Sequence, residues 1–148
     1  PVAPSQKLAP SDRNYFCDSE GWVCRGLVGA LANCSLGPDG RGAPCVEAFA
    51  HMRFLHYQEV GGCLPPHTDL ARTDSRNRHS THTFILYLAD CIDGGETALL
   101  DRIAPGDPET LAAVAPRRGR LLVFPHVCPH KAAPVVEVPK LLLRGEMM

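Results

Sequence analysis

The chain has 148 residues, a length typical of one domain with a sizeable hydrophobic core. A hydrophobic fraction of 45% and a charged fraction of 21% are ordinary for a globular protein, and a formal net charge of −1 gives no general attraction to nucleic acid or to an anionic membrane. No apolar run approaches the ~20 residues of a membrane-spanning helix. The first residues, Pro-Val-Ala-Pro, lack Met and a basic-then-apolar leader, which favours a piece of a longer product without a signal peptide.

The chain has seven cysteines, which is a high and odd number, and none of them forms a Cys-x-x-Cys pair. This spacing argues against a zinc ribbon or a thioredoxin-like site. Reduced, mostly buried thiols in a reducing compartment, cytoplasm or nucleus, are favoured. A disulfide framework in a secretory lumen is the alternative, and it would leave one thiol unpaired.

The N-terminal third of the chain is expected to support the fold and not to supply catalytic residues. Residues 1–14, with three prolines, are expected to be a leading segment or tail. Apolar residues at helical spacing predict a helix from Asp18 or Ser19, either of which would cap it, to about residue 33. The Gly- and Pro-rich residues 35–44 predict a loop.

After that loop the hydrophobic period changes to two, which is typical of strands. The strongest predicted strand covers residues 81–89, which are rich in β-branched and aromatic side chains. Further strands are predicted at 53–57, 96–100, 110–114, 120–124, 135–136 and 140–144, and residues 67–69 are expected to be extended. Many short strands with Gly and Pro between them, after one helix, predict a mainly β sandwich or jelly-roll barrel. We expect a single domain over 1–148, with a leading segment at 1–14, helix and loop support at 15–46 and the β core at 47–148.

The motif on which the functional interpretation depends is His67-Thr68-Asp69. In an extended strand, residues i and i+2 point to the same face, so the imidazole and the carboxylate are offered to one ion. A distant second His would complete a facial set of two His and one carboxylate, an arrangement that suits non-haem Fe(II). An isolated His-x-Asp also occurs by chance, so the motif needs its context.

That context resembles the Fe(II)/2-oxoglutarate-dependent dioxygenases, specifically their prolyl 4-hydroxylase-like branch. The matching pieces occur in the family's order, and they are Tyr57…His67-Thr-Asp69, Thr83-Phe-Ile-Leu-Tyr87-Leu-Ala-Asp90, Gly94-Gly-Glu-Thr97, residues 116–124, and His130-Lys-Ala-Ala-Pro-Val135…Lys140. The resemblance implies a double-stranded β-helix (jelly-roll) core with N-terminal helical support. It also implies Fe(II), 2-oxoglutarate as cosubstrate and O2, with ascorbate as a further candidate, and hydroxylation of a C–H bond with release of succinate and CO2.

The resemblance further implies roles for individual residues. His67, Asp69 and His130 would bind the metal and form the catalytic centre. Lys140 would pair with the far carboxylate of 2-oxoglutarate, because a buried ammonium needs a partner. The expected cosubstrate pocket also includes Tyr57, Tyr87, Thr83 and Ile85.

Several alternatives stay open at this point. By strand alternation, Arg144 shares the face of Lys140 and could take its role, and Lys140 could instead extend to solvent. His126 could replace His130 as a ligand, or His126, Cys128 and His130 together could bind a different metal. Either tyrosine could simply fill the core.

The polar loop at 70–80 leaves directly from Asp69, and we expect it to form a lid whose Arg72, Arg76 and Arg78 contact substrate. The favoured substrate is a peptidyl or protein residue such as proline. A nucleic-acid demethylase on the same fold is less consistent with the neutral charge. A non-catalytic, cupin-like metal or ligand-binding module is the alternative of a different class.

Overall fold

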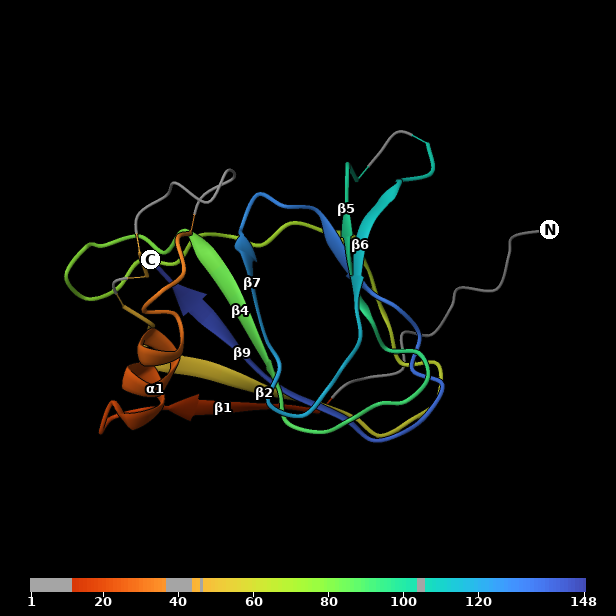
Figure 1. The fold of residues 1–148 in the computed structure, drawn as a ribbon, viewed down its shortest axis with the longest axis horizontal. Coiled ribbons are helices and arrows are strands. Elements are labelled where there is room, and N and C mark those ends of the chain that lie inside the picture. The colour runs from red at the N-terminus through yellow and green to blue at the C-terminus, as the bar shows by residue number, and fades with distance from the viewer. Residues whose placement is uncertain (1–11, 37–43, 46, 104–105) are drawn as a thin grey trace.

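The computed structural model describes residues 12–36, 44–45, 47–103 and 106–148, and within them the chain forms nine strands and one helix. The strands make two antiparallel sheets that face each other, as Figure 1 shows. The larger sheet has the order β1-β2-β9-β4-β7 and the smaller one β3-β8-β5-β6. The elements are β1 (Asp12–Cys17), α1 (Trp22–Ala30), β2 (His51–Tyr57), β3 (Leu64–His67), β4 (His82–Tyr87), β5 (Thr97–Leu100), β6 (Thr110–Val114), β7 (Leu121–Pro125), β8 (His130–Ala132) and β9 (Lys140–Met147). This architecture confirms the predicted mainly β, double-stranded β-helix fold.

Strand β9 lies in the middle of the larger sheet, between β2 and β4, and it is buried on both faces. Leu143 and Met147 point to the outer face, where they pack with Phe84 and Leu27 beneath α1. Leu142 points between the two sheets and joins the second core cluster. Because side chains alternate along a strand, Lys140, Arg144 and Glu146 share this inner face with Leu142. The inner face of β9 therefore combines a hydrophobic core with three charged groups.

Helix α1 begins later than the sequence predicts. Gly21 precedes it in the left-handed conformation, with φ of 70°, so the regular helix begins at Trp22. The carboxylate of Asp18 nevertheless accepts a hydrogen bond of 2.8 Å from the backbone N–H of Cys24, in the first turn. Asp18 thus satisfies one of the free N–H groups at the helix start, as a capping residue does. Within the described residues, no helix is long and apolar enough to cross a membrane.

Strand β1 was not predicted from the sequence. Its residues are mostly exposed, so no alternating hydrophobic pattern marks it. It is an edge strand, held by antiparallel pairing from Asp12–His56 to Cys17–His51. Residues 12–14 therefore belong to the larger sheet rather than to a leading segment, and residues 1–11 lie outside the described part of the chain.

The other predicted strands agree with the structure to within a few residues, except for the one at 135–136. Val135 is fully buried, but its backbone bonds to Gly61 and Gly62 and forms only an isolated bridge with Gly94. Pro134 and Pro139 flank this segment, and proline has no N–H for a sheet ladder. The predicted loop at 35–44 lies mostly outside the described residues, with Ser35 and Pro44 paired across it.

Gly145 allows the close packing of β9 on β4. A Cβ at this position would meet Cε1 of the buried Phe84 at 2.6 Å. We expect Gly145→Ala to lower the free energy of unfolding by about 1–3 kcal/mol, the usual cost of overpacking a core. Gly26 in α1 has nothing within 4 Å of its Cβ position, so Gly26→Ala should instead stabilise by up to about 1 kcal/mol. Urea denaturation of both variants measures the two effects, and a Gly145→Ala protein as stable as the unsubstituted one would contradict this packing.

Candidate metal centre and adjoining cavities

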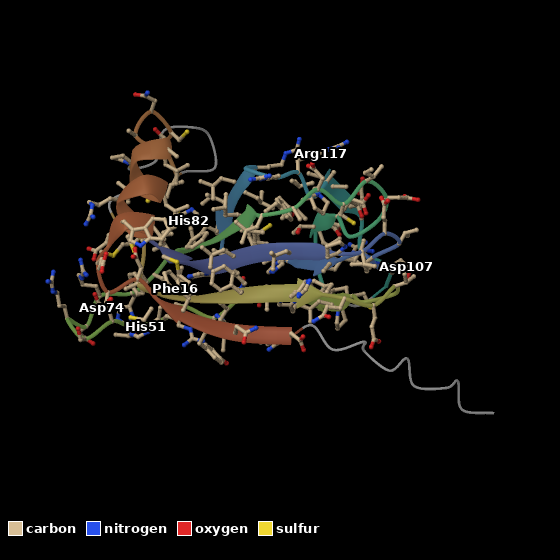
Figure 2. All side chains as sticks on the ribbon, turned by 90° about the horizontal axis from the view of Figure 1, so that it is seen from below. Phe16, His51, Asp74, His82, Asp107 and Arg117 are labelled. Carbon is tan, nitrogen blue, oxygen red and sulfur yellow. The ribbon has the colours of Figure 1, made fainter. Side chains whose placement is uncertain are left out.

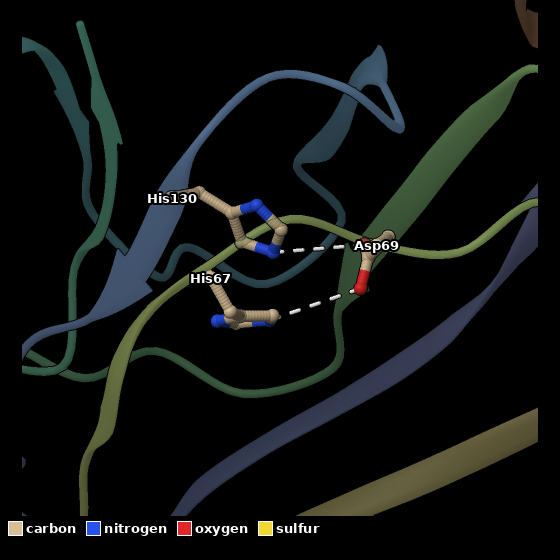
Figure 3. Close-up of side chains that lie close together, drawn as sticks. All are labelled: His67, Asp69 and His130. Carbon is tan, nitrogen blue, oxygen red and sulfur yellow. Dashed lines mark ion pairs between the residues drawn. The ribbon is translucent and has the colours of Figure 1, made fainter. Parts of the chain in front are cut away.

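The three predicted metal ligands come together between the two sheets (Figure 3). His67 is the last residue of β3 and His130 is the first residue of β8, and antiparallel pairing places the two directly opposite each other. Their ring centroids are 4.2 Å apart. Asp69 follows His67 by two residues, beyond the end of β3, and its backbone N–H is anchored to the carbonyl of His126. Strand pairing therefore sets the two imidazoles, and a short extension of the chain brings the carboxylate to them.

The separations fit one shared ion. The Nε2 atom of His67 is 3.7 Å from Oδ1 of Asp69, and Nε2 of His130 is 3.6 Å from Oδ2. All three candidate ligand atoms lie within 4.8 Å of one another. Ligands bound at about 2.0–2.2 Å to one ion lie about 3–4 Å from each other, so small adjustments suffice. Two imidazoles and one carboxylate on one side leave further coordination positions open, as the non-haem Fe(II) set requires.

Backbone carbonyls fix the imidazole tautomers. Nδ1 of His67 lies 2.9 Å from the carbonyl of Pro65, and Nδ1 of His130 lies 3.0 Å from that of Cys128. A carbonyl can only accept, so each Nδ1 carries the proton and each Nε2 presents its lone pair towards Asp69. Burial lowers the pKa of His130, which favours the neutral, metal-binding form.

Two other side chains hold the Asp69 carboxylate. Arg144 forms an ion pair with Oδ1, and the hydroxyl of Thr83 donates a hydrogen bond of 2.6 Å to Oδ2. Burial alone raises the pKa of Asp69, but the hydrogen bond and charge of Arg144, aided by Thr83, outweigh it and hold the pKa at about 2. Asp69 is thus ionised over the whole range in which proteins normally work.

A hydrogen-bond chain extends behind Thr83. Because the Thr83 hydroxyl donates to Asp69, it accepts from Nδ1 of His126 at 3.0 Å. Nε2 of His126 must then accept from the Ser80 hydroxyl at 2.8 Å, and Ser80 accepts from the backbone N–H of Arg72. Both ring nitrogens of His126 are therefore used, and His126 supports Asp69 instead of competing with His130 as a ligand. Nothing in the sequence indicates this role beyond the position of His126 four residues before His130.

Lys140 lies in the interior beyond the metal ligands. It is 1% exposed, and its Nζ atom is 4.8 Å from the centre of the Tyr57 ring. Among the described residues, no carboxylate lies within ion-pair distance of this ammonium. Burial lowers its pKa to about 8, although Cys91 and Glu96 raise it somewhat. A buried cation without an acidic partner is a site for an anion.

A cavity of about 40 Å³ connects Lys140 with the metal ligands, and its walls include three of the residues predicted for the cosubstrate. These are Tyr57, Ile85 and Lys140 itself. The lining also includes Thr97, which the sequence analysis did not single out. The Tyr87 hydroxyl lies 2.6 Å from the Thr97 hydroxyl, so the structure directs Tyr87 towards Thr97. Thr83 is placed against Asp69 and His126, outside the cavity lining.

The arginines of the 70–80 loop are held by acids within the fold. Arg78 forms ion pairs with Glu47 and Asp74, and Arg72 lies 3.6 Å from Glu146. The backbone N–H of Arg76 bonds to Asp74, which folds the loop back on itself. Figure 2 places Asp74 beside His51 at the α1 end of the molecule. The predicted substrate role of these arginines remains a prediction.

All seven cysteines are free. Only Cys45 and Cys91 are buried, whereas Cys17 and Cys34 are exposed and the others are half-buried. The predicted burial of most thiols is therefore wrong.

Comparison with known families adds to this geometry. The 2OG-Fe(II) oxygenase superfamily matches residues 52–145, which include every candidate metal ligand and every residue predicted for the cosubstrate pocket. The chain belongs to this superfamily. It is thus a 2-oxoglutarate-dependent dioxygenase, as the predicted motifs indicate. The search of curated proteins finds no match.

Two solved structures share the fold over nearly the whole chain. A prolyl-4-hydroxylase from Pseudomonas putida is 20% identical with a TM-score of 0.58, and the match covers 98% of this chain and 76% of that one. A prolyl hydroxylase from Trichoplax adhaerens, solved with a hypoxia inducible factor peptide fragment, is 14% identical with a TM-score of 0.63. That match covers 95% of this chain and 64% of the Trichoplax chain. At these identities the likeness establishes a prolyl-hydroxylase fold.

The contact between Thr83 and Asp69 yields a direct test. Thr83→Val keeps the shape of the side chain but removes the hydroxyl, so we expect Fe(II) to bind about 10–100-fold more weakly, as when other groups that orient metal ligands are removed. Thr83→Ser retains a hydroxyl and should keep most of the affinity. Thr110→Val, on the exposed surface of β6, is the matched control. Equal Fe(II) affinity of Thr83→Val and the control, measured by titration under nitrogen, would show that Thr83 does not support Asp69.

Proposed function

We propose that the protein is an Fe(II)- and 2-oxoglutarate-dependent hydroxylase that acts on a peptidyl residue, with proline as the first candidate. The observation that carries this proposal is the convergence of His67, Asp69 and His130 beside a cavity that His67 and His130 line together with the buried Lys140. A metal set and an isolated interior cation are the two features that a chelating dicarboxylate needs.

In this proposal His67, Asp69 and His130 hold Fe(II) on one side. Bound Fe(II), 2-oxoglutarate and O2 together supply oxidative decarboxylation of the cosubstrate to succinate and CO2, coupled to hydroxylation of a C–H bond. The protein's residues supply position and polarity. Arg144 and Thr83 keep Asp69 ionised and oriented, and the backbone carbonyls of Pro65 and Cys128 hold the imidazoles with Nε2 towards the ion.

Lys140 is proposed to pair with the far carboxylate of 2-oxoglutarate. Arg144, the other candidate, already forms an ion pair with Asp69, whereas Lys140 has no acidic partner among the described residues. Thr97, Tyr57 and Ile85 line the space between Lys140 and the metal ligands and would enclose the body of the cosubstrate. Tyr87 would act on it through Thr97.

The peptide substrate is supported by the fold and by one relative. The Trichoplax prolyl hydroxylase, which shares this fold, is solved with a peptide fragment. The net charge of −1 gives no general attraction to the phosphates of nucleic acid. We propose that the 70–80 loop, with Arg72, Arg76 and Arg78, borders the substrate entrance as a lid, and that ascorbate serves as a reductant. We further propose a reducing compartment, because all seven thiols are free.

The proposed activity is tested by succinate formation from 2-oxoglutarate in the presence and absence of Fe(II), together with mass spectrometry of proline-containing peptides for a gain of one oxygen. We expect both products to require Fe(II), and Asp69→Ala to abolish them, because two imidazoles alone hold the ion poorly. Undiminished hydroxylation by Asp69→Ala would refute the metal assignment. A non-catalytic metal-binding module would bind Fe(II) yet form no succinate.

Substitution of Lys140 and substitution of Arg144 are expected to have different effects. Loss of one partner of a buried ion pair costs about 3–5 kcal/mol, so Lys140→Ala should raise the KM for 2-oxoglutarate by about a hundredfold or more while Fe(II) affinity changes little. Arg144→Ala should instead weaken Fe(II) binding, because it frees Asp69. If the two variants show the reverse pattern, the cation is wrongly assigned.

A pH profile gives a second readout of Lys140. Its pKa of about 8 means that the ammonium is charged below pH 8 and loses its proton above it. The value of kcat/KM for 2-oxoglutarate should therefore fall up to tenfold per pH unit above about pH 8, since this parameter reports the free enzyme. Lys140→Arg stays charged, so its profile should lack this descent.

A further inference from the structure

A second cavity, of about 230 Å³, adjoins the candidate metal ligands, and Lys140 is not part of its lining. His67 and Asp69 form part of its wall, and the remaining polar lining consists of three arginines, Arg13, Arg53 and Arg144. It shares Leu55, Leu64, His67 and Arg144 with the smaller cavity that reaches Lys140, so the two adjoin at the metal centre. The proposed hydroxylase would bring its substrate to the metal from a space of this kind.

The register of the larger sheet explains why three arginines gather there. Arg53 of β2 pairs directly with Arg144 of β9, and Arg13 of β1 pairs with Leu55, two residues further along β2. Paired residues and residues two apart share a face, so all three lie on the inner face of the sheet. Three neighbouring strands thus each place one guanidinium beside the metal centre.

The positive charge of this cluster is not balanced by acids. Glu146 is shared, at 2.7 Å from Arg53, 3.4 Å from Arg144 and 3.6 Å from Arg72, and Asp69 is the only other acid in contact with the group within the described residues. The three arginines of the cavity against these two carboxylates leave a surplus of one positive charge, and Arg72 shares Glu146 as well. Arg13 has no ion pair among the described residues. Burial, followed by the charge of Arg144, lowers the pKa of Arg53, in agreement with a crowded cationic group.

We propose that this cavity binds a carboxylate of the substrate, supplied by an acidic side chain close in sequence to the peptidyl residue that is hydroxylated. Guanidinium groups bind carboxylates through two parallel hydrogen bonds, and the cavity offers more than one such group. The inference rests on the proposed function, because it specifies the substrate of the same site. It assigns Arg13 and Arg53 as residues that determine specificity.

The geometry of the sheet limits how far along the substrate peptide the acidic residue lies from the hydroxylated residue. Adjacent strands are about 5 Å apart, so Arg53 lies one spacing from Arg144 at the candidate metal centre, whereas Arg13, two strands away and two residues further along, lies about 12 Å from it. An extended peptide advances about 3.4 Å per residue, which places the acidic side chain within about three residues of the target. Tyr15, on the same face of β1 and 80% exposed, lines a neighbouring cavity with Arg53 and offers an apolar surface to such a peptide.

An acidic peptide fits better than a nucleic-acid strand. Glu146 lies in the middle of the arginine group and Glu47 close to the 70–80 loop, where they would repel a continuous run of phosphates. Binding to a nucleic-acid strand needs a basic track along the backbone, which a local cluster of this size does not supply. A single carboxylate needs only the local cluster.

The test uses the full chain with Fe(II) and 2-oxoglutarate in the absence of O2, and measures binding of fluorescent peptides by anisotropy. Each peptide contains one proline and an Asp at one, two or three residues before or after it, and each has a partner with Asn in place of Asp. We expect the best Asp peptide to bind at least tenfold more tightly than its Asn partner. The double variant Arg13→Gln/Arg53→Gln should lose about 10–100-fold for the Asp peptide, the range of hydrogen bonds to charged groups, and little for the Asn peptide.

Two further variants complete the design. Arg117→Gln, on an exposed turn that Figure 2 places on the opposite side of the molecule from β1, removes the same charge and should leave the Asp preference intact. Arg13→Glu should reverse the preference towards a peptide with Lys in place of Asp. Since Arg13 is exposed, this single change keeps the test valid should the double variant not fold.

Equal binding of Asp and Asn peptides by the unsubstituted protein would overturn the inference, and so would an Asp preference that survives in the double variant. Displacement of the Asp peptide by an oligonucleotide of random sequence at equal concentration would overturn it in favour of nucleic acid. The proposed function fails separately. A selectively bound Asp peptide that gains no oxygen when O2 is admitted supports the cavity assignment and contradicts the hydroxylase, whereas hydroxylation without an Asp preference does the opposite.

Discussion

The ionised carboxylate of Asp69 is the group on which the rest of the site depends. Its side chain is only 7% exposed, and a carboxylate with so little contact with water and no partners would take up a proton and lose its value as a ligand. Arg144 on one oxygen and Thr83 on the other prevent this, and they also fix the direction in which the carboxylate points. The two imidazoles need no comparable help, because strand pairing and two backbone carbonyls already orient them.

Strand β9 shows how one sheet serves both stability and chemistry. Its outward side chains pack beneath α1. Its inward side chains are, in turn, Lys140, which has no acidic partner among the described residues, the apolar Leu142, Arg144 beside Asp69, and Glu146 among the arginines. Because side chains alternate with a period of two, this one strand places apolar and charged groups one after another along its inner face. A shift of register by one residue would exchange these two sets of side chains and destroy the core and the site together. The fold is therefore constrained at β9 by two independent requirements.

The sequence was sufficient for those features that depend on local pattern. The alternating residues 81–89 identified β4, and the resemblance to a known family placed the metal ligands and Lys140. Features that depend on contacts between distant segments were not accessible. The exposed strand β1 has no hydrophobic period, and it forms because it pairs with the edge of β2. His126 looked like a rival ligand because its spacing from His130 is suggestive, and only the fold shows that Ser80 and Thr83 use both of its nitrogens. In the same way, strand alternation places Arg144 and Lys140 on one face, so it could not show which of the two cations is available to the cosubstrate carboxylate.

The different roles of Arg144 and Lys140 follow from the residues that each cation contacts across the barrel. Arg144 faces the loop that follows β3, and this loop carries Asp69, so its charge is used within the protein. Lys140 faces the aromatic ring of Tyr57 and the wall formed by Thr97, and no acid in the described chain reaches it. A folded protein tolerates an interior ammonium of this kind only at a cost in desolvation, and its lowered pKa reflects that cost. An anionic ligand between Lys140 and the candidate metal ligands would remove this penalty, so the lack of an acidic partner for Lys140 among the described residues supports a dicarboxylate cosubstrate more strongly than the candidate metal ligands alone.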